Sequence, residues 1–208
     1  MTSTSGSGPG RPPDPDIERR AIEATLEIYS EVGWAGFTFD AVARRAKVGK
    51  AALYRRWPSK QDLIVEAIET LRLPRRKPVT GPIRDDLRSV AESLTRRYAG
   101  RHGLAFLRAQ LEAKVYPDVL GAAMDTSRKS IIAKGRKIIL SAVERGELPP
   151  GTSPGMVMDG LAGAIVNHIL MAPETRVAEI ADDPAQFSDR VVDLVLDGAR
   201  AAARTPVS

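Results

Sequence analysis

Residues 41–60, AVARRAKVGKAALYRRWPSK, combine dense positive charge with regularly spaced apolar side chains. The stretch contains seven lysine or arginine residues and no aspartate or glutamate. Its spacing predicts two short helices, over residues 39–47 and 50–57, joined by a brief turn. Such a pair is typical of a helix-turn-helix, whose second helix lies in the major groove of DNA. The apolar residues that would fix the angle between the two helices are Val42, Ala46, Val48 and Leu53.

The charge of this stretch indicates its partner. No carboxylate occurs between Ala41 and Gln61. A carboxylate there would be repelled by the phosphates of DNA, whereas lysine and arginine are attracted to them. We therefore expect double-stranded DNA to be the partner of this surface.

The composition of the whole chain narrows the class of protein. With 208 residues and 43% hydrophobic content, the chain can form one domain of moderate size or a small domain joined to a larger one. It contains no cysteine, which excludes disulfides, thiolate nucleophiles and cysteine-based zinc sites. No apolar run approaches the roughly 18 residues of a membrane span, and the N-terminus lacks the apolar core of a signal peptide. We expect a soluble cytoplasmic protein without membrane association, cofactor or bound metal.

Periodicity divides the chain into four parts. Residues 1–15 are rich in Gly, Ser, Thr and Pro and predict a disordered tail. Residues 16–73 contain the helix-turn-helix and its supporting helices, and residues 74–82, rich in proline and charge, predict a linker. Residues 83–208 have helical periodicity without an alternating strand pattern. The prediction is an all-α protein of about nine helices.

Capping residues predict where the first helices begin and end. The Asp-Pro pair at residues 14–15 would start the first helix, and Gly33 would end it. Thr38 would cap the first helix of the basic pair. Ser59 and Asp62 have the spacing of a capping box, with Asp in place of the usual Glu or Gln, and would open the helix that follows.

The same residues resemble a known family. Residues 35–68, AGFTFDAVARRAKVGKAALYRRWPSKQDLIVEAI, are similar to the DNA-binding domain of the TetR family of bacterial transcriptional regulators, and the match extends back to Ala21. LYRRWPSK at residues 53–60 is its most specific part. The resemblance implies an N-terminal three-helix helix-turn-helix domain and a larger helical domain for effector binding and dimerisation. It also implies a repressor that a small molecule releases from a palindromic operator.

The resemblance implies roles for single residues. Those expected to contact phosphates, and so to fix the register of the domain on DNA, are Thr38, Tyr54 and Lys60. Those expected to face base edges are Lys50, Ala51, Ala52 and Arg56. Arg56 is the preferred donor to guanine. The other basic residues expected on the DNA-binding surface are Arg44, Arg45 and Arg55. Trp57 is expected in the core.

Two positions depart from the family pattern. Lys47 stands where the family commonly has glycine, so either a non-glycine residue has a positive φ or the turn has a different shape. Gly49 stands where serine is common at the helix N-cap, a change that weakens the cap by only about a few tenths of a kcal/mol. Both departures affect the tilt of the second helix and therefore its base contacts.

For the larger region, the resemblance implies an effector cavity and a homodimer. The effector is unknown, and an anionic or neutral apolar ligand is favoured over a cation. Candidate residues of the cavity are Tyr98, His102, Phe106, Gln110, Met124, Asn167 and His168. The dimer would be a four-helix bundle of the last two helices, which could alternatively pack only within the chain. Its candidate contact residues are Leu161, Ala164, Ile165, Val191, Leu194 and Val195.

Two other functions stay open on the sequence alone. An enzyme is disfavoured, because the only histidines are His102 and His168 and no H-E-x-x-H, G-x-S-x-G or Gly-rich phosphate loop occurs. We therefore predict no catalytic residue. A helical interaction protein would bind DNA or acidic partners without sequence preference, and salt would weaken that binding steeply.

Overall fold

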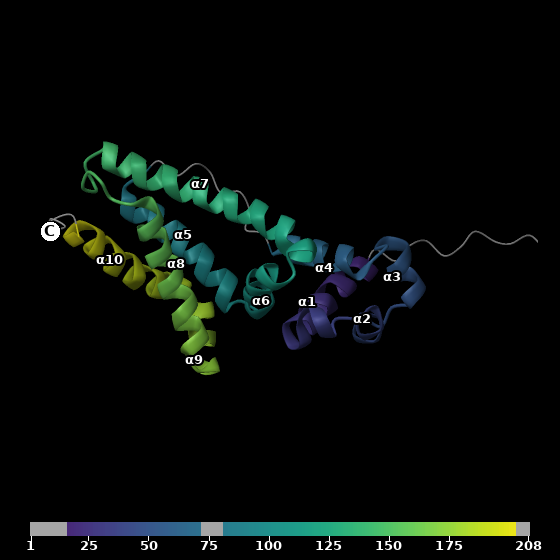
Figure 1. Cartoon of the computed structure of the whole chain (residues 1–208). Helices are drawn as coiled ribbons and strands as arrows, with labels where there is room; N and C mark the ends of the chain where they lie inside the picture. Colours follow the sequence, from purple (N-terminus) through teal and green to yellow (C-terminus); the bar gives the residue numbers. More distant parts are fainter. Residues whose placement is uncertain (1–15, 72–80, 203–208) are drawn as a thin grey trace, which may run out of the picture. The chain divides into compact units, whose positions relative to one another are not determined.

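The computed structural model describes residues 16–71 and 81–202 (Figure 1). In this part of the chain the structure consists of ten α-helices and one π-helical turn, without strands. The chain divides into two compact units, the first ending at Ala67 and the second beginning at Ile68. The predicted tail, residues 1–15, and most of the predicted linker, residues 74–82, lie outside the described residues. No described helix is long and apolar enough to cross a membrane.

Four helices contribute to the first unit: α1 (Asp16–Gly36), α2 (Phe39–Ala46), α3 (Lys50–Arg56) and α4 (Lys60–Thr70), whose residues from Ile68 onward belong to the second unit. Their apolar sides meet in one core. Its largest wholly buried side chains include Tyr29, Phe37, Leu53, Trp57 and Leu63. Burying a side chain of this kind stabilises the fold by about 1.5–3 kcal/mol. The predicted core position of Trp57 is confirmed, and its indole N–H donates a hydrogen bond of 2.9 Å to Glu66.

The first helix is interrupted at a glycine. Gly33 has φ 66° and ψ −173°, a conformation that glycine adopts without the steric cost of a Cβ. A further helical turn follows, as far as Gly36, and the chain then buries Phe37 before α2 begins. The prediction that regular helix ends at Gly33 is confirmed, because the backbone leaves helical geometry there.

Lys47 closes the turn between α2 and α3. Its φ of 54° and ψ of 46° are left-handed, and it is the only non-glycine residue with positive φ in residues 16–71 and 81–202. Its N–H donates to the Arg44 carbonyl at 3.3 Å, and the N–H of Val48 donates to the Ala43 carbonyl at 3.0 Å. These two bonds are those of a Schellman motif, in which glycine is the usual left-handed residue. Of the two alternatives for this turn, the positive φ is confirmed.

Two predicted helix caps are present in the first unit. The Thr38 hydroxyl accepts a hydrogen bond from the Ala41 N–H at 3.3 Å. Ser59 and Asp62 cap α4 reciprocally: the Ser59 hydroxyl accepts from the Asp62 N–H at 3.2 Å, and the Asp62 carboxylate accepts from the Ser59 N–H at 3.0 Å. Gly49 precedes α3 and supplies no side-chain cap. Local sequence therefore sets the start of α2 and α4, whereas α3 depends on its buried residue.

The second unit contains α5 (Ile83–Ala99), α6 (Gly103–Val115), η1 (Pro117–Gly121), α7 (Ala122–Glu144), α8 (Pro154–Met171), α9 (Glu174–Asp182) and α10 (Pro184–Ala202). Its core lies between α5, α7, α8 and α10. The short helix α9 has no counterpart in the sequence prediction. Only two of its side chains are large and apolar, Val177 and Ile180, which is too few for a clear helical period.

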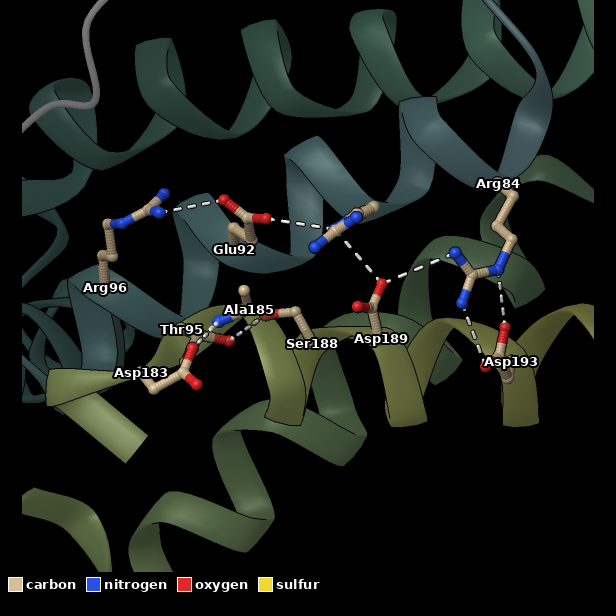
Figure 2. Close-up of polar contacts among 10 residues, drawn as sticks. Arg84, Glu92, Thr95, Arg96, Asp183, Ala185, Ser188, Asp189 and Asp193 are labelled. Carbon is tan, nitrogen blue, oxygen red and sulfur yellow. Dashed lines mark hydrogen bonds and ion pairs between the residues drawn. The ribbon is translucent and has the colours of Figure 1, made fainter. Parts of the chain in front are cut away.

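Polar contacts tie α5 to α10 (Figure 2). The Arg84 guanidinium donates to both carboxylate oxygens of Asp193, at 2.9 and 3.1 Å, and lies 3.6 Å from Asp189. Further along the same pair of helices, the buried hydroxyls of Thr95 and Ser188 are 3.1 Å apart. Because the two groups of contacts are spaced along the helices, they fix the register of α10 against α5.

The prediction of dimer-contact residues needs correction. Three of these residues lie in the core of their own chain and present little or no surface to a partner: Leu161, Ile165 and Val191. Ala164 and Val195 are half-buried, and Leu194 is 69% exposed. The error has a physical origin: α8 is apolar around most of its circumference, so its pattern does not indicate which face is inward.

Candidate DNA-binding surface and effector site

The predicted DNA-binding residues lie on the accessible side of the first unit. The exposed ones are Thr38, Arg44, Arg45, Lys50, Ala51, Tyr54, Arg55 and Arg56. Ala52 and Lys60 are half-buried. Leu53 of α3 is wholly buried among them. One face of α3 is therefore anchored in the core while the opposite face is open to a ligand.

The three residues expected to bind phosphates line one open hollow. Thr38, Tyr54 and Lys60, together with Lys50, form part of the wall of a depression of about 310 Å³. The Tyr54 ring packs against Phe39 with 4.6 Å between centroids, which orients the phenol. The hollow therefore gathers a hydroxyl, a phenol and two ammonium groups, which can donate hydrogen bonds to phosphate oxygens, together with the carboxylate of Asp40.

Lys60 has a second set of contacts within the first unit. Its ammonium donates to the carbonyls of Trp34 and Phe37 at 3.4 and 3.2 Å and lies 4.1 Å from the centroid of the Trp34 ring. Carbonyls near the end of a helix carry partial negative charge, which a lysine neutralises. An ammonium has three N–H donors, so one is left for a phosphate. Lys60 thus joins the start of α4 to the end of α1.

Carboxylates from outside residues 41–61 pair with two residues expected to face bases. Lys50 lies 2.7 Å from Asp40, and the hydrogen bond to this carboxylate raises the pKa of Lys50. Arg56 lies 3.3 Å from Glu18 of α1 and 3.8 Å from Glu66 of α4. The basic stretch has no acid of its own, but the fold brings neighbouring acids to it.

Arg45 is also paired, whereas two other arginines are not. Arg45 donates to Glu31 at 2.9 Å and to Glu27 at 3.4 Å, and its hydrogen bond lowers the pKa of Glu31. Arg45 therefore holds α2 against α1. Arg44 and Arg55 form no ion pair within residues 16–71 and 81–202. These acidic partners were not predicted from the sequence. Glu27 and Glu31 lie one helical turn apart on α1, and this spacing is a signal for an acidic site that pairs with a basic residue.

Some of the predicted effector residues lie together. Tyr98 at the end of α5 packs against Phe106 of α6, with 5.7 Å between ring centroids. Its hydroxyl donates to the Gln110 side chain at 3.0 Å, and burial raises the pKa of Tyr98. His102 is the residue before α6. Arg97, which the sequence does not single out, joins this group with its guanidinium carbon 4.4 Å from the Phe106 centroid.

Three other predicted effector residues lie elsewhere. Met124 is half-buried in α7, and Asn167 is exposed on α8. His168 is exposed and its ring lies 4.9 Å from that of Phe187. Among the described residues, no hydrogen bond or ring contact joins these three residues to Tyr98. No group of histidines and carboxylates suited to a metal ion occurs among the described residues.

Known proteins match both units of the chain. Residues 21–67 match the family model of bacterial regulatory proteins, tetR family, and residues 77–195 match that of the tetracyclin repressor-like, C-terminal domain. The HTH-type transcriptional regulator Rv1556 of Mycobacterium tuberculosis H37Rv is 35% identical over 164 residues. The match covers 75% of this chain and 79% of that relative.

Solved structures show the same fold at lower identity. MexZ, described as a key repressor responsible for antibiotic resistance in Pseudomonas aeruginosa, has a TM-score of 0.73 at 17% identity and covers 94% of this chain and 100% of its own. FadR from Bacillus subtilis, solved in complex with stearoyl-CoA, has a TM-score of 0.63 at 19% identity and covers 86% and 98%. The family consists of transcriptional regulators rather than enzymes. The chain belongs to the TetR family of bacterial regulatory proteins and is a DNA-binding transcriptional regulator.

Proposed function

We propose that this regulator is a cytoplasmic repressor that binds a palindromic operator as a homodimer and is released by a small-molecule effector. The observation that carries the proposal is the hollow lined by Thr38, Tyr54 and Lys60, beside the exposed face of α3. Phosphate contacts fix a protein on the duplex, and side chains in the major groove select the sequence. The arrangement supports both tasks on one surface.

The exposed residues of α3 support base recognition. The guanidinium of Arg56 has the donor geometry for O6 and N7 of guanine, and the small Ala51 leaves room for a thymine methyl group. Lys50 adds a donor for guanine or for a phosphate. Arg44 and Arg55, without ion pairs in the described part of the chain, are free to contact phosphates on either side. Arg56 therefore selects the base sequence, whereas Arg44 and Arg55 bind phosphates of any sequence.

A dimer follows from the small size of the recognition helix. Because α3 has only seven residues, it contacts few base pairs, and two copies on half-sites about 34–36 Å apart, or a multiple of that, would supply the affinity. The outer faces of α8 and α10 support a dimer contact through the exposed residues Gly160, Gly163, Leu194 and Gly198. A Cβ at Gly163 would meet no atom of this chain within 4 Å, so a partner helix can approach closely.

The group around Tyr98, Phe106 and Gln110 supports an effector site in the second unit. The structure of FadR with stearoyl-CoA supports a ligand-binding role for this fold, and the description of MexZ as a repressor supports repression. An effector releases DNA if it binds better to a form whose recognition helices are wrongly spaced, and only by its difference in affinity for the two forms. Helix α4 links DNA binding to effector binding, because it begins with Lys60 and its last turn belongs to the second unit.

The dimer proposal is tested with Leu194→Arg, which places a charge on the exposed face of α10. Leu111→Arg is the matched control, because Leu111 is similarly exposed but lies on α6. Sedimentation measures the assembly, and fluorescence anisotropy compares duplexes with one half-site and with two. We expect L194R to be monomeric and to lose the preference for two half-sites, whereas L111R keeps both properties. A dimeric L194R with an unchanged preference contradicts the proposed contact.

A further inference from the structure

Arg97 of α5 is an arginine with a buried guanidinium nitrogen and no carboxylate partner. Its Nε is inaccessible to solvent and has no hydrogen-bond acceptor among the described residues. None of the described carboxylates forms an ion pair with it. Its neighbour Arg96 is different, because it is exposed and pairs with Glu92 at 2.9 Å. Two consecutive arginines of one helix therefore have opposite surroundings.

Two aromatic side chains pack beside this guanidinium, and an amide side chain is hydrogen-bonded to one of them. The guanidinium carbon lies 4.4 Å from the centroid of Phe106, and the Tyr98 ring packs on the same phenylalanine. The Tyr98 hydroxyl donates to the side-chain oxygen of Gln110, so the amide nitrogen of Gln110 keeps its two N–H donors for another acceptor. The group thus offers hydrogen-bond donors and positive charge without an anion to receive them.

A close approach of two helices holds the group in place. A Cβ on Gly103, the first residue of α6, would collide with the carbonyl oxygen of Tyr98. The Gly103 N–H donates to the Gly100 carbonyl at 2.8 Å and closes the connection. Because the glycine allows this contact, the aromatic residues of α5 and α6 are positioned before any ligand arrives.

The isolation of Arg97 is energetically unfavourable. Burial lowers the pKa of Arg97, but an arginine keeps its proton in proteins. Arg97 is half-buried, and a partly desolvated charge without an anionic partner destabilises the fold; stacking on the Phe106 ring offsets part of that cost. A bound carboxylate would provide the missing partner, since it accepts two parallel hydrogen bonds from a guanidinium.

We propose that Arg97 binds the carboxylate of a small organic acid and that this acid is the effector; the effector role rests on the function proposed above. The carboxylate accepts hydrogen bonds from Arg97 and from the amide of Gln110. The apolar part of the acid lies along Tyr98. A neutral amide of the same length lacks the charge and the second acceptor oxygen, so it gains much less from Arg97.

The test compares acids with amides that have the same apolar group. The probes are sodium octanoate and sodium 3-phenylpropionate, with octanamide and 3-phenylpropanamide as neutral counterparts. Isothermal titration calorimetry is performed on the full chain, on Arg97→Met and on the matched control Arg96→Met. We expect at least one acid to bind wild type and R96M, and R97M to bind it between about 10-fold and 100-fold more weakly. Equal binding of the acid by wild type and R97M, or no binding of either acid by wild type, overturns the proposal.

Thermal unfolding without any acid separates a binding role from a structural one. Because Arg97 has no carboxylate partner to lose, and methionine can still pack against Phe106, R97M is expected to melt at or above the temperature of wild type. A clearly lower melting temperature for R97M would show that Arg97 supports the fold, and would contradict the proposal. A lower value for R96M would not, since Arg96 loses its pair with Glu92.

DNA binding separates this inference from the proposed function. Without acid, all three proteins are expected to bind the same selected duplex, and acid is expected to release wild type and R96M but not R97M. If acid binds through Arg97 and DNA stays bound, the effector role is wrong. If wild type shows no sequence-specific DNA binding, the proposed function fails whatever the acid does.

Discussion

Asp40 pairs with Lys50 across the turn between α2 and α3, with 2.7 Å between the carboxylate oxygen and the ammonium nitrogen. Both residues line the hollow that Tyr54 and Lys60 also border. In the free protein, a positive charge expected to meet DNA is therefore already neutralised. DNA has to replace this carboxylate before Lys50 can contact it.

Asp40→Asn is expected to strengthen DNA binding and to steepen its salt dependence. The substitution frees Lys50, and one additional phosphate contact changes the slope of log K against log salt by about one unit. Fluorescence anisotropy over a series of salt concentrations measures this slope. Glu174→Gln is the control, because it makes the same change in charge on α9 of the second unit. Identical slopes for D40N and wild type would show that Lys50 does not gain a phosphate contact.

Arg56→Ala and Lys60→Ala are expected to differ in kind. Loss of Arg56 should cost about 1–3 kcal/mol on the preferred sequence and relax selection at one base position, whereas loss of Lys60 should weaken all sequences alike and flatten the salt slope by about one unit. K60A should also melt at a lower temperature, because Lys60 bonds to the carbonyls of Trp34 and Phe37. Binding to a panel of single-base variants measures the difference. Identical patterns for the two variants would contradict the assigned roles.

Lys47→Gly is expected to stabilise the first unit. A side chain in the left-handed region costs about 1–2 kcal/mol relative to glycine, part of which the flexibility of unfolded glycine offsets. We expect the free energy of unfolding to rise by up to about 1 kcal/mol, measured by urea denaturation. Lys137→Gly in the middle of α7 is the control and should lower it by about 1 kcal/mol. A loss of stability in K47G would contradict strain at Lys47.

The stability of the second unit is expected to depend on the charge of Glu147. The Glu147 carboxylate accepts from the Ile83 N–H at 2.6 Å, and this bond, with that from Arg145, lowers the pKa of Glu147. Since the folded-state pKa lies below the unfolded one, the stabilisation is present at neutral pH and disappears as pH falls through the folded-state pKa. Melting temperatures of wild type and Glu147→Gln should therefore differ at neutral pH and converge in acid. A difference that stays constant with pH would contradict this role.

Local signals in the sequence predicted the first unit well. The caps at Thr38 and Ser59, the break at Gly33 and the buried Trp57 all depend on residues close together in the chain. The family resemblance indicated that Lys47 stands where glycine is common, and of the two turn shapes left open there the structure has the left-handed one. These features were predictable because their energies are set within one or two helical turns.

Contacts between distant segments were not predictable in the same way. The carboxylates of Glu18 and Glu31 reach the basic surface only because α1 packs beside α2 and α3. Leu161 and Leu194 are both apolar, yet one is wholly buried and the other exposed. The difference depends on which face of each helix meets the core. Because α8 is apolar around most of its circumference, its pattern does not contain that information for Leu161.

Selection of a randomised duplex pool by the purified protein is the most direct test of the central claim. It is performed at about 0.15 M salt, where attraction to phosphates alone is weak. We expect enrichment of a palindrome with two half-sites and loss of enrichment at one base position in each half-site with R56A. A pool recovered without any enriched sequence would contradict a sequence-reading role for α3.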